Sequence, residues 1–362
     1  MPKKIFFTPG PSALYFTVEE HLKKALKDQV MEINHRSKQA EGYFHETVQN
    51  LKTLMNIPED YGIFFLSSAT EIWERQIQNL VTEKSFHYCY GAFSNRFYDF
   101  AKKWGINAQQ AASEFGQLPD TNPALIPAGM ELITVAINET STGVSFPVED
   151  IYAIRKAHPD ALIAVDGVSG FPVTDLDFTQ IDSAYFSVQK CFGLPAGLGV
   201  WIVSPRAIEK AKAKAAQGLP IGTYNSIPNL LKNAEKGQTT FTANVLNIFL
   251  LSKVTGDMLE KGIDVIRREA NYKAALLQHM VEEHPLLDHF VENKAHRSKT
   301  VVVANTSVDS TAIINKLAEK GLVIGNGYSA YKGKQIRIAT FPTHSKEQIE
   351  LLVDMLNDVR SV

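Results

Sequence analysis

Short runs of apolar residues, separated by stretches with helical periodicity, dominate the first half of the chain. Nearly unbroken hydrophobic runs cover residues 63–66, 132–137, 162–165 and 185–188. Such runs favour strands that are buried on both faces, as in a largely parallel sheet. Helical stretches lie between them, for example over residues 147–158. The alternation predicts an α/β fold with helices on both faces of the sheet.

The beginning of the chain has a different pattern. Residues 8–11, Thr-Pro-Gly-Pro, interrupt regular structure and predict an extended arm. Thr17 and Glu20 have the spacing of a capping box, and an apolar stripe behind them predicts a helix. The stripe consists of Val18, Leu22, Ala25 and Leu26. A second helix is predicted over residues 41–55.

The last third of the chain predicts a smaller unit after a long connection. Residues 244–283 are predicted to be mostly helical. Two strands are predicted over residues 300–303 and 336–338, and two helices over residues 309–320 and 346–359. The predicted organisation is an arm over residues 1–15, a large domain over 16–250 and a small α/β domain over 251–362.

Composition narrows the class of protein. The chain has 362 residues, of which 44% are hydrophobic and 21% charged, which is typical of a globular protein with more than one domain. A net charge of −2 argues against a nucleic-acid partner. Cys89, Cys191 and the histidines fit no metal-site spacing. We expect a cytoplasmic protein with no membrane partner, because neither a signal peptide nor a long apolar span is evident.

Polar residues follow the predicted strands at the points where ligands bind to α/β sheets. Residues 67–71 follow the first run, residues 138–140 the second, Asp166 the third and Lys190 the fourth. Asp166 and Lys190 are separated by about the length of one βαβ unit. A single cofactor could therefore contact both strand ends.

Each candidate has an alternative interpretation. Small residues at 68–70 would admit an anion at a helix N-terminus, or they would form an ordinary helix cap. Asp166 could cap a helix, bind a metal or pair with a cation. Lys190 precedes a loop rich in Gly and Pro, and a desolvated amine there would be nucleophilic. The alternative is a lysine that extends to the surface.

In order and spacing, the polar segments resemble the class V aminotransferases, and within that family the phosphoserine branch. The segments cover residues 7–11, 33–37, 67–71, 91–96, 138–143, 165–170, 187–190 and 336–338. The resemblance implies a large domain of the aspartate-aminotransferase type, with a mostly parallel seven-stranded sheet, and a smaller C-terminal α/β domain. It also implies pyridoxal 5′-phosphate as the cofactor.

The resemblance assigns roles to individual residues. Lys190 would carry the cofactor as a Schiff base and move the substrate proton, and Asp166 would pair with the pyridine nitrogen. The other expected cofactor contacts are Ser68, Ala69, Thr70, Phe93, Thr140 and Gln189. Thr239 and Thr240 would reach the phosphate of the neighbouring subunit's cofactor, which implies a homodimer with shared active sites.

Three residues are expected to bind the substrate. Arg337 would hold the α-carboxylate, a task that suits a guanidinium, although a strand-edge surface residue is the alternative. His35 and Arg36 would recognise the distal anion, or they would simply form a polar loop. The phosphoserine branch usually has a second His-Arg pair in the stretch that corresponds to residues 326–333. That pair is missing here, although Lys332 could supply charge.

The resemblance implies transfer of an amino group from L-glutamate to 3-phosphohydroxypyruvate, which gives 2-oxoglutarate and O-phospho-L-serine in serine biosynthesis. The nearest alternative is another class V transaminase, such as an alanine/serine–glyoxylate or serine–pyruvate aminotransferase. A cysteine desulfurase would need a mobile catalytic cysteine. A binding protein that only keeps the fold is the non-enzyme alternative.

Overall fold

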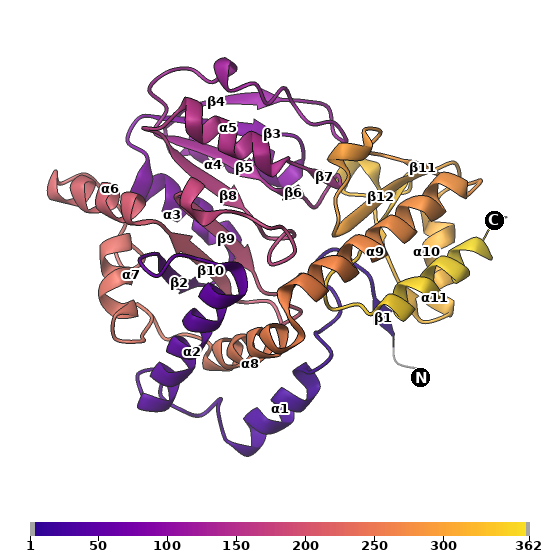
Figure 1. Cartoon of the computed structure of the whole chain (residues 1–362), viewed down its shortest axis with the longest axis horizontal. Helices are drawn as coiled ribbons and strands as arrows, with labels where there is room; N and C mark the ends of the chain where they lie inside the picture. Colours follow the sequence, from indigo (N-terminus) through magenta and orange to yellow (C-terminus); the bar gives the residue numbers. More distant parts are fainter. Residues whose placement is uncertain (1–3, 360–362) are drawn as a thin grey trace.

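The computed structural model describes residues 4–359 and contains two main sheets that lie side by side (Figure 1). The larger sheet has seven strands in the order β2-β10-β9-β8-β5-β3-β4, and the smaller has four in the order β11-β12-β15-β14. Strand β10 is antiparallel to both neighbours, and the other pairings in the larger sheet are parallel. The predicted fold, a mostly parallel sheet with a smaller α/β unit, is confirmed.

The strands of the larger sheet include all four apolar runs, with shifted ends. Their bounds are β2 Gly62–Leu66, β3 Lys84–Cys89, β4 Asn107–Ala112, β5 Leu132–Ala136, β8 Leu162–Asp166, β9 Ser183–Ser187 and β10 Gly199–Val203. Three of these strands, β3, β4 and β10, were not predicted. Strand β4 is a half-exposed edge strand with no apolar run. Strand β3 contains the buried His87, which hydrogen-bonds to Ser85 and Thr134.

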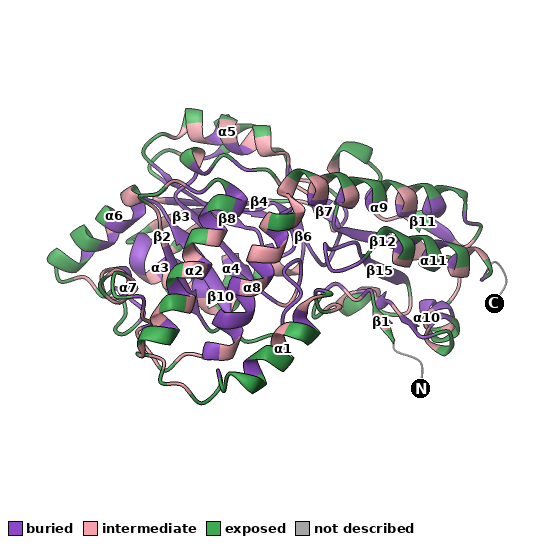
Figure 2. Ribbon diagram, turned by 60° about the horizontal axis from the view of Figure 1, so that its bottom comes forward, coloured by how far each residue is buried: buried purple, intermediate pink, exposed green. Residues whose placement is uncertain are grey.

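Helices cover both faces of the larger sheet, because successive strand residues point to opposite sides. Phe65 and Val165 pack on the face covered by α2, α5 and α8, whereas Phe64 and Tyr185 pack against α3, α4, α6 and α7. The helix bounds are α1 Val18–Lys27, α2 Lys38–Met55, α3 Ala69–Leu80, α4 Ala92–Lys103, α5 Val148–Ala157, α6 Pro205–Ala216, α7 Ile227–Ala234 and α8 Val245–Lys261. Figure 2 shows the buried strands between helices whose outer surfaces are exposed.

The predicted long helical connection is interrupted once. Helix α9, Ile263–Glu283, follows α8 after Gly262, whose φ of 85° ends the first helix. Helix α9 leads to the smaller sheet (Figure 1), where its apolar residues join a separate core cluster. None of the helices in residues 4–359 is long and apolar enough to cross a bilayer. The domain boundary near residue 250 stays a prediction.

The smaller unit has the predicted strands and helices with changed ends. Its elements are β11 Leu287–His289, β12 Val301–Thr306, α10 Ser310–Glu319, β13 Leu322–Val323, β14 Gly325–Asn326, β15 Gln335–Ala339 and α11 Lys346–Asn357. Two further short strands, β6 Asn138–Glu139 and β7 Val144–Ser145, pair with each other. The 3-10 helices are η1 Pro123–Leu125, η2 Phe178–Gln180, η3 Lys294–His296 and η4 Ser329–Tyr331.

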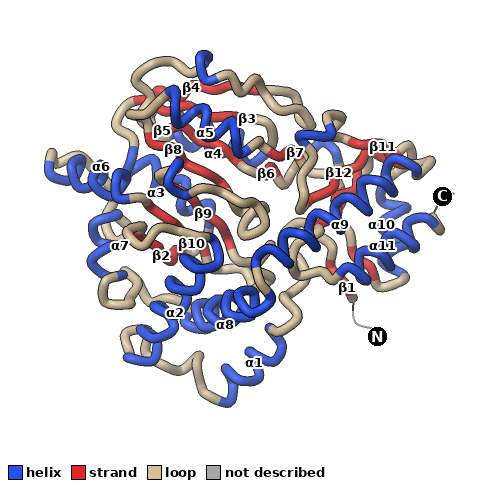
Figure 3. Tube along the Cα trace, in the orientation of Figure 1, coloured by secondary structure: helices blue, strands red, loops and turns tan. Residues whose placement is uncertain are grey.

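The predicted extended arm connects the two units, as the loop trace of Figure 3 shows. Within the arm, strand β1, Ile5–Phe6, pairs with β13. The backbone N–H of Ser12 then donates to the Gln189 carbonyl over 3.2 Å, and that of Tyr15 to the Gly193 carbonyl over 2.8 Å. The arm therefore contacts both the smaller unit and the loop that carries Lys190. The first three residues of the predicted arm lie outside the described part of the chain.

The capping box predicted at the start of the first helix is wrong. The Thr17 hydroxyl does not cap α1, because it donates to Asp257 Oδ2 on α8 over 2.5 Å. Leu26 is 64% exposed, so the apolar stripe does not include it. A capping box does occur on α11, between Ser345 and Gln348. The Thr17 hydroxyl thus bonds to Asp257 on another helix and not to the backbone of α1.

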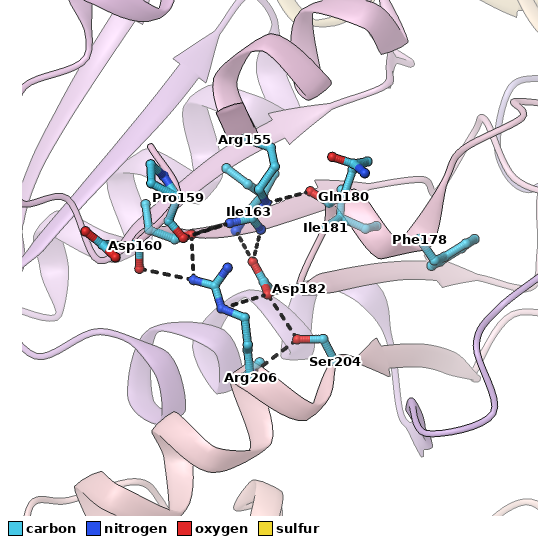
Figure 4. Close-up of polar contacts among 12 residues, drawn as sticks. Arg155, Pro159, Asp160, Ile163, Phe178, Gln180, Ile181, Asp182, Ser204 and Arg206 are labelled. Carbon is cyan, nitrogen blue, oxygen red and sulfur yellow. Dashed lines mark hydrogen bonds and ion pairs between the residues drawn. The ribbon is translucent and has the colours of Figure 1, made fainter. Parts of the chain in front are cut away.

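A buried carboxylate holds the strands at the sheet edge opposite the candidate site (Figure 4). Asp182 directly precedes β9 and is 2% exposed. Its carboxylate accepts from the Ile163 backbone on β8, from the Ser204 hydroxyl after β10, and from Arg155. Arg206 lies 3.7 Å from the same group. This network fixes the relative positions of β8, which ends in Asp166, and β9, which Lys190 follows.

Candidate active site

Neighbouring parallel strands bring Asp166 and Lys190 to the same edge of the larger sheet. Asp166 ends β8, and Lys190 follows β9, which pairs with β8. Both side chains are buried, with 9% and 6% exposure. The connection between the strands contains only η2 and loops, so the predicted βαβ spacing does not include an α-helix.

The environment of the Lys190 amine favours its neutral, nucleophilic form. Its Nζ donates to Thr140 Oγ1 over 2.8 Å and lies 5.2 Å from the centroid of the Phe93 ring. Burial lowers the pKa of Lys190 to about 8, although the charge of Asp166 opposes this effect. The alternative of a lysine that extends to the surface is wrong.

Asp166 is held by two donors. Its Oδ1 accepts from the Val168 backbone N–H over 2.9 Å, and its Oδ2 accepts from the Tyr185 hydroxyl over 3.1 Å. The Tyr185 oxygen in turn accepts from Trp73 Nε1 over 2.7 Å. Burial raises the pKa of Asp166 to about 6, while Lys190 acts in the opposite direction. The carboxylate is therefore ionised near neutral pH. No group of metal-ligating side chains occurs in residues 4–359.

The small residues after β2 lie at the N-terminus of α3. Ser68 Oγ accepts from the Glu71 backbone N–H over 3.1 Å, so Ser68 is a helix cap, which agrees with its alternative interpretation. Ala69 N–H donates to Ser187 Oγ over 2.8 Å, and Thr70 is exposed at the helix start. The ordinary cap does not remove the positive end of the helix dipole, which remains suitable for an anion.

Thr240 is linked to this helix start within its own subunit. The Thr240 hydroxyl donates to Asn225 Oδ1 over 2.5 Å, and Asn225 Nδ2 donates to Glu71 Oε1 over 2.6 Å. The other carboxylate oxygen of Glu71 accepts from the Ser67 N–H and hydroxyl. Asn225 was not predicted, and Glu71 was predicted only as part of the 67–71 segment, without a role of its own. They became visible only through contacts distant in the sequence.

Other predicted residues lie apart from Lys190 within the described chain. His35 lines a cavity of about 450 Å³ together with residues 242–246, and Thr239 lines a smaller hollow beside His35. Arg36 is exposed. Gln189 is half-buried, and its carbonyl accepts from the arm. None of the described contacts joins the side chains of these four residues to Lys190.

Arg337 reaches the site from the smaller sheet. Its Nε donates to the Asn326 carbonyl over 2.7 Å, and its Nη1 donates to the Thr140 carbonyl over 3.5 Å. Within residues 4–359 its guanidinium forms no ion pair, and burial lowers its pKa. A half-buried cation without a carboxylate beside it can bind an anion with both arms of its fork. The alternative of a strand-edge surface residue is therefore wrong.

Glu139 and Gly91 hold the start of α4, where Phe93 lies. The Glu139 carboxylate is fully buried and accepts from the Ser94 N–H and hydroxyl, each over 2.9 Å. It also accepts from the Ser141 hydroxyl over 2.7 Å. A Cβ at Gly91 would lie 2.2 Å from Glu139 Cγ, so any other residue there would force Glu139 out of its position. Residues 138–140 were predicted to lie at the site, but the structural role of Glu139 at the start of α4 was not predicted.

The two thiols are unsuited to attack on a substrate. Cys89 and Cys191 are free and buried, and burial raises the pKa of each to about 12. Neither lies on a mobile surface loop, because both are at most 1% exposed. A thiolate is the nucleophilic form, so these environments argue against a cysteine desulfurase.

Known proteins share this architecture over almost the whole chain. Residues 6–352 match the model of the aminotransferase class-V family. The chain belongs to the class V aminotransferases, which are pyridoxal-phosphate-dependent transferases. It is 28% identical over 353 residues to a phosphoserine aminotransferase of a Nocardioides species, covering 96% of this chain and 92% of that protein.

Solved structures give the same family and the same fold. A crystal structure of a phosphoserine aminotransferase from Cytophaga hutchinsonii is 49% identical and covers 100% of both chains, with a TM-score of 0.97. An aspartate aminotransferase from Thermus thermophilus is 23% identical with a TM-score of 0.86 over 98% of this chain and 99% of that one. The second likeness shows the fold alone.

Proposed function

We propose that this enzyme transfers an amino group between L-glutamate and 3-phosphohydroxypyruvate, which yields O-phospho-L-serine for serine biosynthesis. The proposed substrate is supported by the 49% identity to the phosphoserine aminotransferase of Cytophaga hutchinsonii over the full length of both chains. The observation that carries the reaction is the buried Lys190 amine beside the buried Asp166 carboxylate. The likeness to more distant aminotransferases of other specificity, at 21–23% identity, shows only the fold.

The residues of the site fit pyridoxal 5′-phosphate. Lys190 offers an amine for covalent attachment, and Asp166 offers a carboxylate that is ionised near neutral pH. Phe93 presents its ring near the amine, and Thr140 presents a hydroxyl. The start of α3, with Ser68, Ala69 and Thr70, would hold the phosphate together with Gln189. Bound pyridoxal phosphate supplies an electron sink for the negative charge that develops at the substrate Cα.

The chain's own groups perform the remaining tasks. Lys190 removes a proton from the substrate Cα, a task that suits an amine whose pKa of about 8 is near the working pH. Thr140 orients that amine through its hydroxyl, which in turn donates to Ser169 Oγ over 2.8 Å. Arg337 binds the α-carboxylate. Asp166 places a negative charge at the buried end of the site.

A homodimer accounts for the residues that lie apart from Lys190. His35 and Thr239 line the same hollow with Gly237, Ala243 and Val245, and Arg36 directly follows His35 in the chain. In a symmetric dimer they would complete the site of the neighbouring subunit, His35 and Arg36 at the substrate and Thr239 and Thr240 at the phosphate. Mixing an inactive Lys190 variant with an inactive Arg36 variant tests this sharing. Mixed dimers would regain activity in one of their two sites, and no recovery would contradict it.

Half-reactions test the substrate. Protein loaded with pyridoxal phosphate is mixed with O-phospho-L-serine, L-glutamate or L-alanine, and the absorbance of the bound cofactor is followed. Loss of the absorbance band with the first two amino acids supports the proposal. A response to L-alanine alone would instead favour an alanine–glyoxylate type of transaminase.

A further inference from the structure

A second guanidinium lies at the outer side of the site. Arg96 is on α4, one turn after Phe93, and its central carbon lies 5.6 Å from the Phe93 ring centroid. Its Nη2 donates to the Tyr328 hydroxyl over 3.2 Å. No carboxylate in residues 4–359 forms an ion pair with Arg96. Its charge is thus matched only by a neutral phenol and an aromatic ring.

Tyr328 lies between the two guanidinium groups. Its ring centroid is 5.5 Å from that of Phe93, and the central carbon of Arg337 lies 5.3 Å from the Tyr328 ring. Arg337 also donates to the Thr140 carbonyl, and Thr140 accepts from Lys190. A continuous set of contacts therefore runs from Lys190 through Arg337 and Tyr328 to Arg96.

The loop that carries Tyr328 is held in place. We refer to residues 326–333 as the 326–333 loop. Ser329 has a φ of 51°, which a residue with a side chain rarely adopts, so the backbone after Tyr328 is constrained. Tyr331 packs against Phe115, at 6.0 Å between ring centroids, and against Phe290, at 5.1 Å. Lys332 is the only charged residue of the loop and is exposed.

We propose that Arg96 binds the distal anion of the substrate, a phosphate ester, in place of the Tyr328 hydroxyl. The proposal rests on the function proposed above. A substrate with a carboxylate at one end and a phosphate at the other would engage Arg337 and Arg96 together. A dianionic phosphate is a better partner for a guanidinium than a phenol is, because charge-assisted bidentate hydrogen bonds are stronger than neutral ones. Arg96 thus acts together with the proposed His35 and Arg36 pair to distinguish phosphorylated from unphosphorylated substrates.

The test compares Arg96→Gln with Lys102→Gln. Lys102 is a second exposed cation on α4; its Nζ lies 5.3 Å from the Tyr98 ring, and none of the described contacts joins it to Tyr328. For each loaded protein, kcat/KM of the half-reaction is measured with O-phospho-L-serine and with L-serine. We expect the ratio of the two to fall roughly tenfold to hundredfold in Arg96→Gln, as for a lost charged hydrogen bond. Lys102→Gln should keep the wild-type ratio.

Two further variants separate charge from hydroxyl. Arg96→Lys keeps the charge without the fork, so its ratio should lie between those of the wild type and Arg96→Gln. Tyr328→Phe removes only the hydroxyl that the phosphate replaces, so it should keep the preference for the phosphorylated substrate. An unchanged ratio in Arg96→Gln, or an equal loss in Tyr328→Phe, would overturn the proposal. A wild type without preference for O-phospho-L-serine would instead refute the proposed function, before any substitution is made.

Discussion

Lys190 and Asp166 lie within the edge of one sheet, whereas Arg337, Tyr328 and Arg96 meet where the two sheets approach each other. The first pair is buried, and its partners lie on adjacent strands or within the same loop. The second group is half-exposed and includes cations that no carboxylate neutralises in the described chain. The reacting groups Lys190 and Asp166 are thus fixed in a core, whereas the guanidinium groups of Arg337 and Arg96 have no carboxylate partner within the part of the chain that the structure describes and can pair with an anionic substrate.

The largest effect that we expect comes from replacing the buried lysines, because only one of them lies at the site. Lys190 and Lys214 are equally buried, with 6% exposure each, but Lys214 donates to the backbone carbonyls of Gln78 and Val81. We expect Lys190→Ala to lower the transamination rate at least about a thousandfold, because the base is lost. Half-reaction kinetics with O-phospho-L-serine measure this effect.

The control for that variant is Lys214→Ala. It should lose about 1–3 kcal/mol of stability, because buried carbonyls are left without a donor. Its rate per folded molecule should stay at the wild-type value. Thermal unfolding followed by circular dichroism measures the stability. A catalytic defect in Lys214→Ala as large as that of Lys190→Ala would show that burial alone, and not position, explains the first result.

Asp166→Asn should separate activity from stability. The rate should fall on the order of a hundredfold to a thousandfold, because a preorganised charge is lost in a buried site. Stability of the cofactor-free protein should change in the opposite direction. Burial raises the pKa of Asp166 from 3.8 to about 6, so the ionised form destabilises the folded state at neutral pH. Removing it should stabilise the protein by up to about 3 kcal/mol.

The sign of that effect depends on pH. The folded-state pKa of Asp166 lies above its ordinary value, so the wild type loses stability as the pH rises from about 4 to about 6. Below that window the carboxyl is protonated in both states, and the two proteins should be equally stable. Urea unfolding of the cofactor-free proteins at about pH 3 and at pH 7 measures the difference. A variant that is less stable at pH 7 would contradict the assigned cause of the pKa shift.

The sequence predicted the buried part of the site better than its outer part. The strands that end in Asp166 and precede Lys190 contain nearly unbroken apolar runs, so local patterns were sufficient. The hydroxyl that supports Asp166 was missed, because Tyr185 lies inside such a run and its partner Trp73 is distant in the chain. Strand β4 was missed because edge strands need no apolar face.

The outer part depends on contacts that no local pattern contains. Arg96 is on helix α4 and Tyr328 is in the 326–333 loop of the smaller unit, and only the tertiary fold brings them together. The same limitation explains the wrong capping box, because Asp257 competes for the Thr17 hydroxyl from another helix. The placement of His35 and Arg36 was not predictable in one chain either, since a shared site would need a second subunit. Local propensity is a weak guide wherever tertiary partners compete.

The Arg337→Lys variant tests whether Arg337 acts in substrate binding and not in the reaction step. Lysine keeps the charge but loses the fork, so we expect KM for L-glutamate to rise roughly tenfold. The maximal rate should change less, because the Nζ of Lys190 is held by Thr140 and not by Arg337. Steady-state kinetics with L-glutamate and with O-phospho-L-serine measure KM and kcat. A loss confined to kcat would place Arg337 among the reacting groups and would remove the distinction between the two regions.

The pH dependence of cofactor uptake gives the smallest but most direct measure of the buried region. Burial lowers the pKa of Lys190 to about 8, so the neutral amine becomes scarcer as the pH falls below that value. Uptake of pyridoxal phosphate by the cofactor-free protein should therefore slow about tenfold per pH unit below about 8. Stopped-flow absorbance measures the rate, and the same titration with N-acetyl-lysine corrects for the cofactor's own ionisation.

The Asp166→Asn variant should shift this uptake profile. The charge of Asp166 raises the pKa of Lys190 against the effect of burial, so its removal should move the break to lower pH. A Lys102→Gln protein should retain the wild-type break, because that exposed lysine lies over the Tyr98 ring on α4. If the break stayed at the same pH in Asp166→Asn, the two buried groups would be electrostatically independent. The Asp166 carboxylate could then no longer be what opposes the effect of burial on the pKa of Lys190.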